Sequence, residues 1–503
     1  MAFWIEVSLR QPRNTTKHFA VLATLLIMAL AVVGLTGRWR AGESHSPEAG
    51  DAPRPNILLI VVDALRADRL GCYGHNRALS PTMDAIAAEG VVFGQAVAPA
   101  PWTQPSVAAL FTGMHPGAIL PVEEYRLSFD SVRRGAEPIR VLDDRYTTLA
   151  AALRAQGYST AAIVTNPFVD RDFGFAQGFE HFDAVLSTAT PGNEVNYAGC
   201  TWLEQRDPEK PFFLLLYYMD VHGPYDAKPE FLEPLLDSVE QEPELHRLTP
   251  NQVAQLDPRY LYKLPKVYVN EARHLRLMPF REYWVARYEA GVAELDHHLA
   301  DLRERLIRME LWDDLAVVVT ADHGEALGEN TTFAHGLSVH HVELHVPLIM
   351  RWPRALPAGG HVSDTVCLLD VMPTILDQLD MPPVAGVHGT SLLPYIAGDV
   401  PAEPPALIVE GLKVPGRQVA LYRGDWKLVR LFDPPAQALY HFSQDPFERR
   451  NLARQYPQML ELLVGLEAEQ RNENDWLAAD AQRERIELDQ ERLHQLRSLG
   501  YLR

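Results

Sequence analysis

Cysteine is scarce in this chain of 503 residues, which has only Cys72, Cys200 and Cys367. The number is odd, and no pair has the CxxC spacing of a zinc finger or redox motif. A disulfide-built scaffold is therefore excluded for a protein of this size, although one disulfide bond stays open. We interpret Cys72 as a packing residue and expect none of the three thiols to act as a nucleophile.

Basic residues are also fewer than acidic residues. Lysine and arginine number 46 against 66 aspartates and glutamates, so the formal net charge is -20 at pH 7. No segment resembles a polybasic tract. This balance argues against general affinity for nucleic acid or other polyanions, while a locally basic pocket remains compatible with it. We expect no nucleic-acid partner.

One long uncharged hydrophobic run occurs, at residues 19–36, and Arg10, Arg13 and Lys17 precede it. Its length is near the lower limit for crossing a bilayer, and the sequence VGLTG at 33–37 is a poor cleavage site. We expect residues 1–18 to be cytoplasmic and 19–36 to be a transmembrane anchor, with the rest of the protein outside the cytoplasm, periplasmic or extracellular. The alternative is a cleaved signal segment and a secreted protein.

Four apolar, β-branched or aromatic runs follow, at residues 57–62, 161–165, 212–218 and 315–320. Such runs are typical of strands buried on both faces, and the helical stretch 147–156 lies directly before one of them. Alternating strands and helices predict an α/β fold with a mostly parallel sheet and helices on both faces. The length and the 47% hydrophobic content suit one large domain with a smaller appendage.

Acidic residues and histidines stand directly after three of these runs. Asp63 follows the first, Asp220 and His222 follow the run at 212–218, and Asp322 and His323 follow the run at 315–320. Ligand sites in open α/β sheets lie beyond the carboxyl ends of the strands. Two carboxylates and one imidazole from adjoining strand ends would suit a divalent metal ion.

Many short motifs occur in a particular order. They are RPNI (54–57), PWTQPSVAALFTG (101–113), TADHGEALGE (320–329), FAHG (333–336), VPLI (346–349), GTSLLP (389–394) and WKL (426–428). In order and spacing this set resembles the sulfatase family of the alkaline phosphatase superfamily, from residue 54 to about residue 452. The resemblance implies an ester-cleaving enzyme with a small antiparallel sheet near the C-terminus, for which residues 407–409, 419–422 and 426–429 are strand candidates.

Thr103 stands where the resemblance places the cysteine that sulfatases oxidise to formylglycine. The extra methyl group of threonine prevents formation of that aldehyde, so we expect no formylglycine. Other branches of the superfamily use a threonine nucleophile, and metal coordination is a general way to activate a hydroxyl group. The Thr103 oxygen would then complete a four-ligand shell with Asp63, Asp322 and His323.

The resemblance also bears on the identity of the metal. Sulfatases usually bind calcium through additional oxygens, from an aspartate after the first one and an asparagine beside the later one. Here Ala64 and His323 occupy those places. Losing a carboxylate and gaining an imidazole favours zinc or manganese over calcium.

Two further histidines, His222 and His335, have family counterparts beside the transferred group, where they contact its oxygens or protonate the leaving oxygen. An alternative is that Asp220, His222 and His335 bind a second metal ion, as in two-metal relatives. We expect Glu325 to support His323.

Other histidines rank lower. His297 belongs to DHH at 296–298, inside a stretch with helical spacing at 288–305, which we interpret as a solvated part of an amphipathic helix. Of His340, His341 and His345, we expect at most one to reach the site.

Together these residues predict a metal-dependent hydrolase or transferase that acts on phosphate or sulfate esters through Thr103. Phosphoryl transfer is preferred because a threonine sulfate lacks the diol route for expelling sulfate, and hydrolysis of sulfuric esters is the alternative. Val107 replaces a family arginine and offers no charge to the transferred group, so Arg66 or Lys427 are candidates to compensate. A hypothesis of another class is a membrane-anchored pseudoenzyme with a binding role. Substrate identity and oligomeric state stay open.

The domain organisation follows from these landmarks. We expect a linker at residues 37–53, a catalytic domain at 54–400, a C-terminal subdomain at 401–456 and a helical tail at 457–503.

Overall fold

The computed structural model describes residues 54–119, 139–184, 192–240, 280–329, 333–411, 418–479 and 485–486. By contacts the chain divides into two units, Met1–Pro53 and Arg54–Arg503, and every described residue belongs to the second. The expected transmembrane segment at 19–36 and linker at 37–53 lie outside the described residues. Within the described ranges, no helix combines the length and the apolar character needed to cross a bilayer.

A nine-stranded sheet forms the centre of the second unit. Strands β1, β6, β4 and β5 pair in parallel, and so do β1 with β7 and β12 with β2. Strand β11 joins the two groups by antiparallel pairing with β7 and β2, so the sheet is mixed but mostly parallel, as predicted. Its order is β10 (His345–Val346), β2 (Val91–Val97), β11 (Leu348–Arg351), β7 (Ala316–Ala321), β1 (Ile57–Val62), β6 (Phe212–Tyr218), β4 (Ser159–Val164) and β5 (His181–Ala184), with β12 (Gly360–Cys367) beside β2.

The central strands are the apolar runs of the sequence. Every residue of β1, β4, β6 and β7 is buried, as expected for parallel strands covered on both faces. The predicted ranges 57–62 and 212–218 match β1 and β6, while those for β7 and β4 differ by one or two residues at each end, a usual uncertainty for strand limits.

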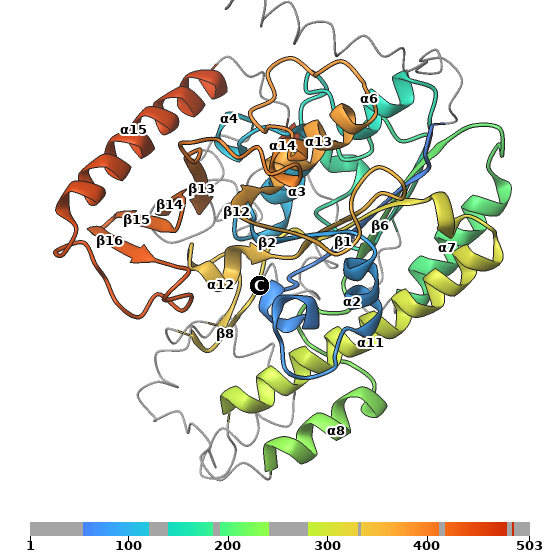
Figure 1. Ribbon diagram of the computed structural model, residues 1–503, viewed down its shortest axis with the longest axis horizontal. Helices are drawn as coiled ribbons and strands as arrows, with labels where there is room; N and C mark the ends of the chain where they lie inside the picture. Colours follow the sequence, from blue (N-terminus) through green and yellow to red (C-terminus); the bar gives the residue numbers. More distant parts are fainter. Residues whose placement is uncertain are drawn as a thin grey trace, which may run out of the picture. The chain divides into compact units, whose positions relative to one another are not determined.

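Helices cover both faces of this sheet (Figure 1). On one side lie α2 (Pro81–Ala88), α7 (Gly192–Gln205) and the long α11 (Phe280–Arg308), with α8 (Pro229–Glu240) packed on α11. On the other side lie α3 (Thr103–Thr112), α6 (Leu149–Ala155) and α13 (Val371–Gln378). The α/β prediction is therefore confirmed.

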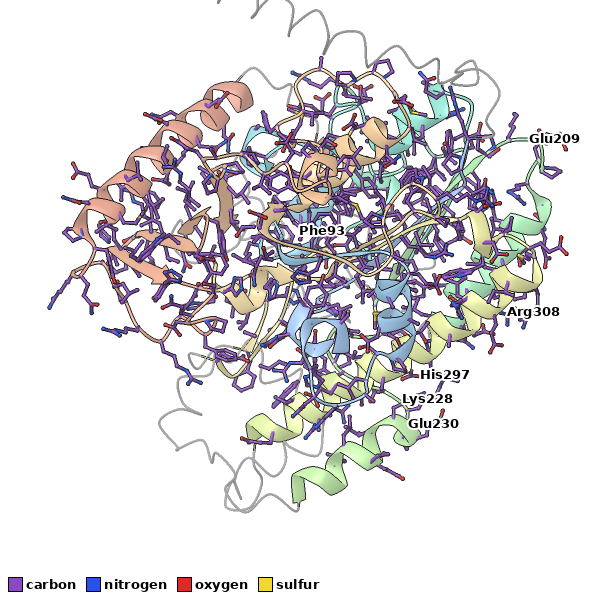
Figure 2. All side chains as sticks on the ribbon, viewed as in Figure 1. Phe93, Glu209, Lys228, Glu230, His297 and Arg308 are labelled. Atoms are coloured by element: carbon purple, nitrogen blue, oxygen red, sulfur yellow. The ribbon has the colours of Figure 1, made fainter. Side chains whose placement is uncertain are left out.

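The interpretation of residues 296–298 as solvated is wrong for two of the three. Asp296 is buried and accepts hydrogen bonds from the backbone amides of Thr82 and Met83, at the start of α2. His298 is buried as well, and only His297 is exposed, at the outer surface near Lys228 (Figure 2). Helices α2 and α7 pack against α11 on either side of its apolar face. Polar residues beside that face are therefore buried as well.

A second, smaller sheet follows near the C-terminus, and it is antiparallel, as predicted. It consists of β13 (Leu407–Gly411), β14 (Gln418–Arg423), β15 (Trp426–Phe432) and β16 (Pro435–His441), with α15 (Pro457–Ala479) packed against β13, β14 and β15. Three of these strands coincide with the predicted candidates, and Gly424 with φ 55° forms the turn between β14 and β15. Strand β16 was missed, because two prolines, Pro434 and Pro435, mark its start as a turn.

Candidate active site

The order of the central strands explains why distant residues meet. Strand β1 lies between β6 and β7, with Val62 aligned to Tyr218 on one side and to Ala321 on the other. Asp63, directly after β1, therefore stands beside Asp322, directly after β7. Parallel pairing places all of these ends at the same edge of the sheet.

Asp63, Asp322 and His323 form a buried group, the metal-type cluster. Their potential ligand atoms all lie within 4.8 Å of one another. The Nε2 atom of His323 is 3.6 Å from Asp63 Oδ1 and 3.4 Å from Asp322 Oδ2. Asp322 Oδ1 accepts hydrogen bonds from the backbone amides of Ala64 (3.1 Å) and His323 (2.8 Å). Ala64 has the left-handed φ of 61°, uncommon for a residue other than glycine, and this conformation accompanies the contact of its amide with Asp322.

The charge of this cluster fits a divalent cation. Asp63 Oδ1 is buried, and it has no hydrogen-bond partner among the residues that the structure describes. Burial and the neighbouring charge of Asp322 raise the pKa of Asp63 well above its usual range. A cation at this place would turn the repulsion between the two carboxylates into attraction, and two carboxylates with one imidazole are a suitable donor set.

Thr103 is fully buried at the first position of α3, and its Oγ1 lies 3.4 Å from Nε2 of His323. The first-turn amides of Thr103 and Gln104 have no carbonyl acceptor within the helix, and the helix dipole is positive at this end. The hydroxyl of Ser106 donates to the backbone carbonyl of Asp322, which holds α3 against the cluster. The structure thus brings Thr103, Asp63, Asp322 and His323 together.

Two residues of this site were missed in the sequence. Asn166, just beyond β4, donates from Nδ2 to Asp63 Oδ2 (2.5 Å) and lies 3.4 Å from Thr103 Oγ1. The hydroxyl of Tyr217 lies 2.7 Å from Asp322 Oδ2 and 3.2 Å from Asp63 Oδ2. The rule that ligand sites lie beyond the strand ends could have found Asn166, because it follows the apolar run at 161–165. Tyr217 lies inside an apolar run and gave no signal.

His335 lies next to the metal-type cluster, with ring centroids 4.2 Å from His323 and 5.2 Å from His222. Its Nδ1 is 3.2 Å from Glu325 Oε1. The Nδ1 of His323 instead faces the carbonyl of Gly324 at 2.8 Å. The expectation that Glu325 supports His323 is therefore wrong, because the chain turns Glu325 toward His335.

The proposed second metal set is not assembled. Asp220 Oδ1 accepts a hydrogen bond from Gly192 N (2.9 Å) and lies 2.8 Å from Nδ1 of His298, so Asp220 is directed toward α7 and α11. His222 and His335 do come together without it. Among the residues that the structure describes, the group with metal-ligand geometry is that of Asp63, Asp322 and His323.

Neither candidate compensates for Val107. Arg66 donates to Asp68, to Glu329 and to the carbonyl of Glu325. The Nζ atom of Lys427 donates to the carbonyl of Val339 and to Glu448. Both cations are thus committed to other partners, and Val107 itself is part of the hydrophobic core.

Three histidines shortly after His335 connect the two sheets. His340 bonds with Glu448, and His341 lies 3.2 Å from the hydroxyl of Tyr422 in β14 and stacks on His345 with ring centroids 4.8 Å apart. His345 faces the carbonyl of Gly94 in β2 at 2.9 Å. These contacts hold the segment that follows His335 in place.

Glu343 fastens this segment to the metal-type cluster. Its carboxylate accepts a hydrogen bond from the Ser338 hydroxyl, and its backbone carbonyl accepts one from Gly324 N at 2.8 Å. The side chain is fully buried, and burial raises the pKa of Glu343 to about 8. A protonated, neutral Glu343 therefore suits this position best.

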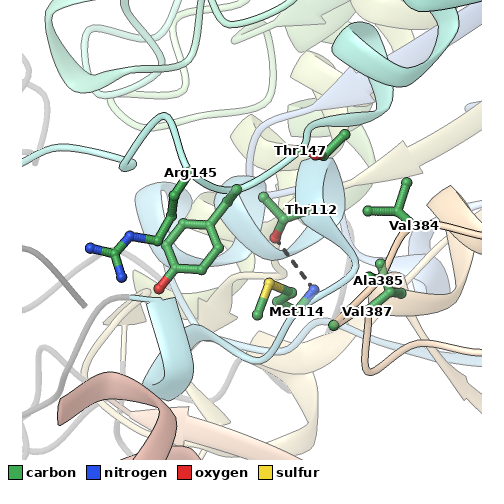
Figure 3. A pocket seen from close by; sticks show the side chains of 9 residues that line it. Thr112, Met114, Arg145, Thr147, Val384, Ala385 and Val387 are labelled. Atoms are coloured by element: carbon green, nitrogen blue, oxygen red, sulfur yellow. Dashed lines mark hydrogen bonds between the residues drawn. The ribbon is translucent and has the colours of Figure 1, made fainter. Parts of the chain in front are cut away.

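A pocket of about 210 Å³ lies at the other end of α3 (Figure 3). Thr112, the last residue of this helix, lines it together with Met114 and Arg145. A ten-residue α-helix is about 14 Å long between its first and last residues, so this pocket is separate from Thr103. The chemistry of the cluster does not extend to it.

The cysteines take no part in this site. All three are free, so the disulfide left open by the sequence does not form. Burial raises the pKa of Cys72 to about 12 and that of Cys200 to about 11, which disfavours a reactive thiolate.

Comparison with known proteins decides the family. The sulfatase family model matches residues 55–381, more than half of the chain. The chain belongs to the sulfatase family. A second model, described as N-sulphoglucosamine sulphohydrolase, C-terminal, matches residues 328–474, which include the small sheet. This family consists of hydrolytic enzymes that typically use a divalent metal ion, and the chain is a sulfatase-family hydrolase.

The curated relatives are named for different substrates. A delta 4,5-hexuronate-2-O-sulfatase of Bacteroides thetaiotaomicron is 24% identical over 80% of this chain and 85% of its own length. Arylsulfatase K of Rattus norvegicus is 23% identical over 86% of this chain and 81% of its own length.

Solved structures share the fold. One protein, in complex with its substrate D-glucosamine-2-N,6-O-disulfate, has a TM-score of 0.66 and 22% identity, covering 84% of this chain and 98% of its own. The phosphonate monoester hydrolase of Agrobacterium radiobacter has a TM-score of 0.64 and 21% identity, covering 84% of this chain and 96% of its own. The same fold thus occurs in enzymes named for sulfate and for phosphonate esters.

We predict that the purified protein binds one equivalent of zinc or manganese per chain, measured by elemental analysis after dialysis. Asp63→Asn and Asp322→Asn should each lower this content, because each removes a ligand charge. Asp220→Asn is the matched control and should leave it unchanged. Two equivalents in the parent, with one lost in Asp220→Asn, would contradict the single site.

We also predict a pH-dependent stability that comes from Glu343. A carboxyl with its folded-state pKa raised to about 8 contributes stability that is full below about pH 4.5 and is lost as the pH rises through about 8. Glu343→Gln should therefore gain stability relative to the parent as the pH rises from about 4.5 to about 8, in urea unfolding. The exposed Glu304→Gln is the control, and equal pH dependence in all three proteins would contradict this prediction.

Proposed function

We propose that this hydrolase cleaves a phosphate, phosphonate or sulfate ester with Thr103 as its nucleophile, and that phosphoryl transfer is the preferred reaction. The observation that carries the proposal is the position of Thr103 Oγ1, 3.4 Å from His323 Nε2 at the positive end of α3. The same Nε2 atom lies 3.6 Å from Asp63 Oδ1 and 3.4 Å from Asp322 Oδ2, so one nitrogen faces Thr103 and both carboxylates.

Asp63, Asp322 and His323 would hold a divalent cation, for which zinc or manganese suits the carboxylate and imidazole donors. Such a cation lowers the pKa of a coordinated hydroxyl and stabilises charge on the ester oxygens. Tyr217 and Asn166 keep the two carboxylates in place by donating hydrogen bonds to them.

The chain's own residues support a two-step displacement. Thr103 Oγ1 loses its proton to solvent and forms a bond to phosphorus or sulfur while the bond to the leaving oxygen breaks, and His222 or His335 supplies the proton that this oxygen takes up. Water then attacks the same centre and gives one proton back to that histidine. The bond to Thr103 breaks, and Oγ1 takes up a proton from solvent, which restores the hydroxyl. The positive end of the α3 dipole, at Thr103, favours negative charge in both steps.

A threonine at position 103 favours transfer of a phosphoryl group over transfer of a sulfuryl group. A formylglycine hydrate can expel sulfate by re-forming its aldehyde, but a threonine ester has no such route and needs direct attack at phosphorus or sulfur. The occurrence of this fold in phosphonate monoester hydrolases supports phosphorus chemistry, and the sulfatase names among the relatives support sulfuric ester hydrolysis as the second candidate.

Thr103→Ala should lower kcat/KM by at least about 10³-fold because it removes the nucleophile, while Asp63, Asp322 and His323 should still retain the metal ion. Thr103→Ser should keep part of the activity. Cys72→Ala, the control for a thiol nucleophile, should be unaffected. Mass analysis of the Thr103 peptide after a rapid acid quench should find the transferred group on the parent.

Full activity in Thr103→Ala would contradict the proposal. A parent that turns over neither phosphate nor sulfate esters would instead favour the pseudoenzyme with a binding role.

The charges around Thr103 predict a preference for esters whose transferred group carries one negative charge. Asp63, Asp322 and Glu325 surround the site, and Arg66 is neutralised by its own partners. With one divalent cation the local charge is not positive, so a dianion is disfavoured.

Methyl p-nitrophenyl phosphate should therefore have a kcat/KM at least about tenfold above that of p-nitrophenyl phosphate at pH 8. The sulfate ester p-nitrophenyl sulfate, also a monoanion, provides the test between phosphorus and sulfur. Preference for the phosphate dianion would contradict the charge argument, and turnover of the sulfate ester alone would contradict the preference for phosphorus.

A further inference from the structure

We propose that Asn166 is a catalytic residue, which donates a neutral hydrogen bond to the Thr103 oxygen and to the group that this oxygen carries. The proposal rests on the proposed role of Thr103 as nucleophile. It assigns to Asn166 the part that a cationic side chain would otherwise play beside the transferred group.

The hydrogen bond to Oδ1 of Asn166 fixes the orientation of its side-chain amide. Asn166 is fully buried, and its Oδ1 accepts a hydrogen bond from the backbone amide of Phe168 at 2.7 Å. An acceptor is required there, so the nitrogen of the side chain must point the opposite way, into the site. The ring of Phe168 also packs edge-on against Trp102, directly before Thr103, with centroids 5.9 Å apart. Asn166 and Thr103 are thus held against each other.

The Nδ2 group has two protons and two neighbours. One neighbour is Asp63 Oδ2 at 2.5 Å, and the other is Thr103 Oγ1 at 3.4 Å. The second distance is long for a hydrogen bond to a neutral hydroxyl. Such a contact shortens and strengthens as negative charge develops on Oγ1 or on the oxygens attached to the new bond. An interaction that grows toward the transition state raises kcat more than it lowers KM.

The other side chains discussed near Thr103 have different partners or positions, so we assign the donor role to Asn166. In the described ranges, the side chains with a hydrogen bond to Thr103 Oγ1 are His323 and Asn166. His323 is assigned to the metal-type cluster, Val107 is buried in the core, and Arg66 is bonded to Asp68 and Glu329. A neutral donor also agrees with a singly charged transferred group, since it adds no positive charge to the site.

Two substitutions test the proposal in the metal-loaded full-length protein. Asn166→Asp keeps the acceptor for Phe168 N but replaces the donor, and Asn166→Ala removes both. Each should lower kcat by about 10²- to 10³-fold, the usual loss for one donor to a developing charge, with KM changed by less than about threefold. The metal content should stay that of the parent.

The control is Asn196→Asp, at an equally buried asparagine of α7 whose amide bonds with Tyr218 and His298. It should lower the melting temperature without lowering kcat, and so it separates loss of stability from loss of catalysis.

A second measurement does not depend on turnover. Orthovanadate adopts the five-coordinate geometry of a phosphoryl-transfer transition state, so its affinity, measured by calorimetry, should fall at least about tenfold in both Asn166 variants. The affinity for inorganic phosphate should stay within about threefold of the parent.

Unchanged kcat and vanadate affinity in Asn166→Ala would overturn the proposal, while loss of activity in Thr103→Ala would leave the nucleophile standing. A fall in metal content that matches the fall in kcat would also overturn it, because Asn166 would then act only by holding Asp63. Full activity in Thr103→Ala would remove the nucleophile and this inference together.

Discussion

The close approach of two buried carboxylates, Asp63 and Asp322, is the constraint on which the site depends. Strand β1 lies between β7 and β6, and this order places both acids at one edge of the sheet. Bringing two like charges together in the protein interior is unfavourable without a cation and hydrogen-bond donors. The donors are present in Tyr217, in Asn166 and in the amide of Ala64, and all of them point to the carboxylates. The surrounding structure is thus organised to hold negative charge that a divalent cation would balance.

The small C-terminal sheet contributes to this site through the segment that carries His335. Lys427 in β15 donates to the carbonyl of Val339, and Tyr422 in β14 meets His341. Glu343 then connects the same segment back to Gly324, beside the metal-type cluster. Since these contacts run from the small sheet to the cluster without a break, the C-terminal part shapes the active site and is more than an appendage. Burial of these charged and polar groups in pairs makes the connection rigid.

The sequence was most informative where one rule determines the outcome. Continuous apolar runs predicted β1 and β6 residue by residue, and the strand-end rule pointed to Asp63, Asp322 and His323 before any geometry was known. The sequence did not predict contacts that depend on the direction in which a side chain points. Asp220 stands two residues from His222, yet Asp220 turns to α7 and α11, and Glu325 reaches His335 instead of His323. Such directions depend on packing across the sheet, which neither spacing nor composition records. Asn166 was overlooked for another reason, since an asparagine after a strand is common in turns.

If Thr103 is the nucleophile as proposed, Thr103 and Val107, at the places where the motif resemblance puts a cysteine and an arginine, form one coherent change. An aldehyde hydrate beside an arginine suits a chemistry in which the enzyme expels sulfate by itself. In the proposed mechanism the covalent ester on Thr103 is opened by water, so attack on the bound group has to remain feasible. A cationic side chain in addition to the divalent cation would stabilise the ester as well as the transition state, whereas a neutral donor at 3.4 Å from Thr103 Oγ1 contributes mainly as charge develops. Val107 in the core and Asn166 in the site therefore agree with a nucleophile whose intermediate has to be cleaved by a second molecule.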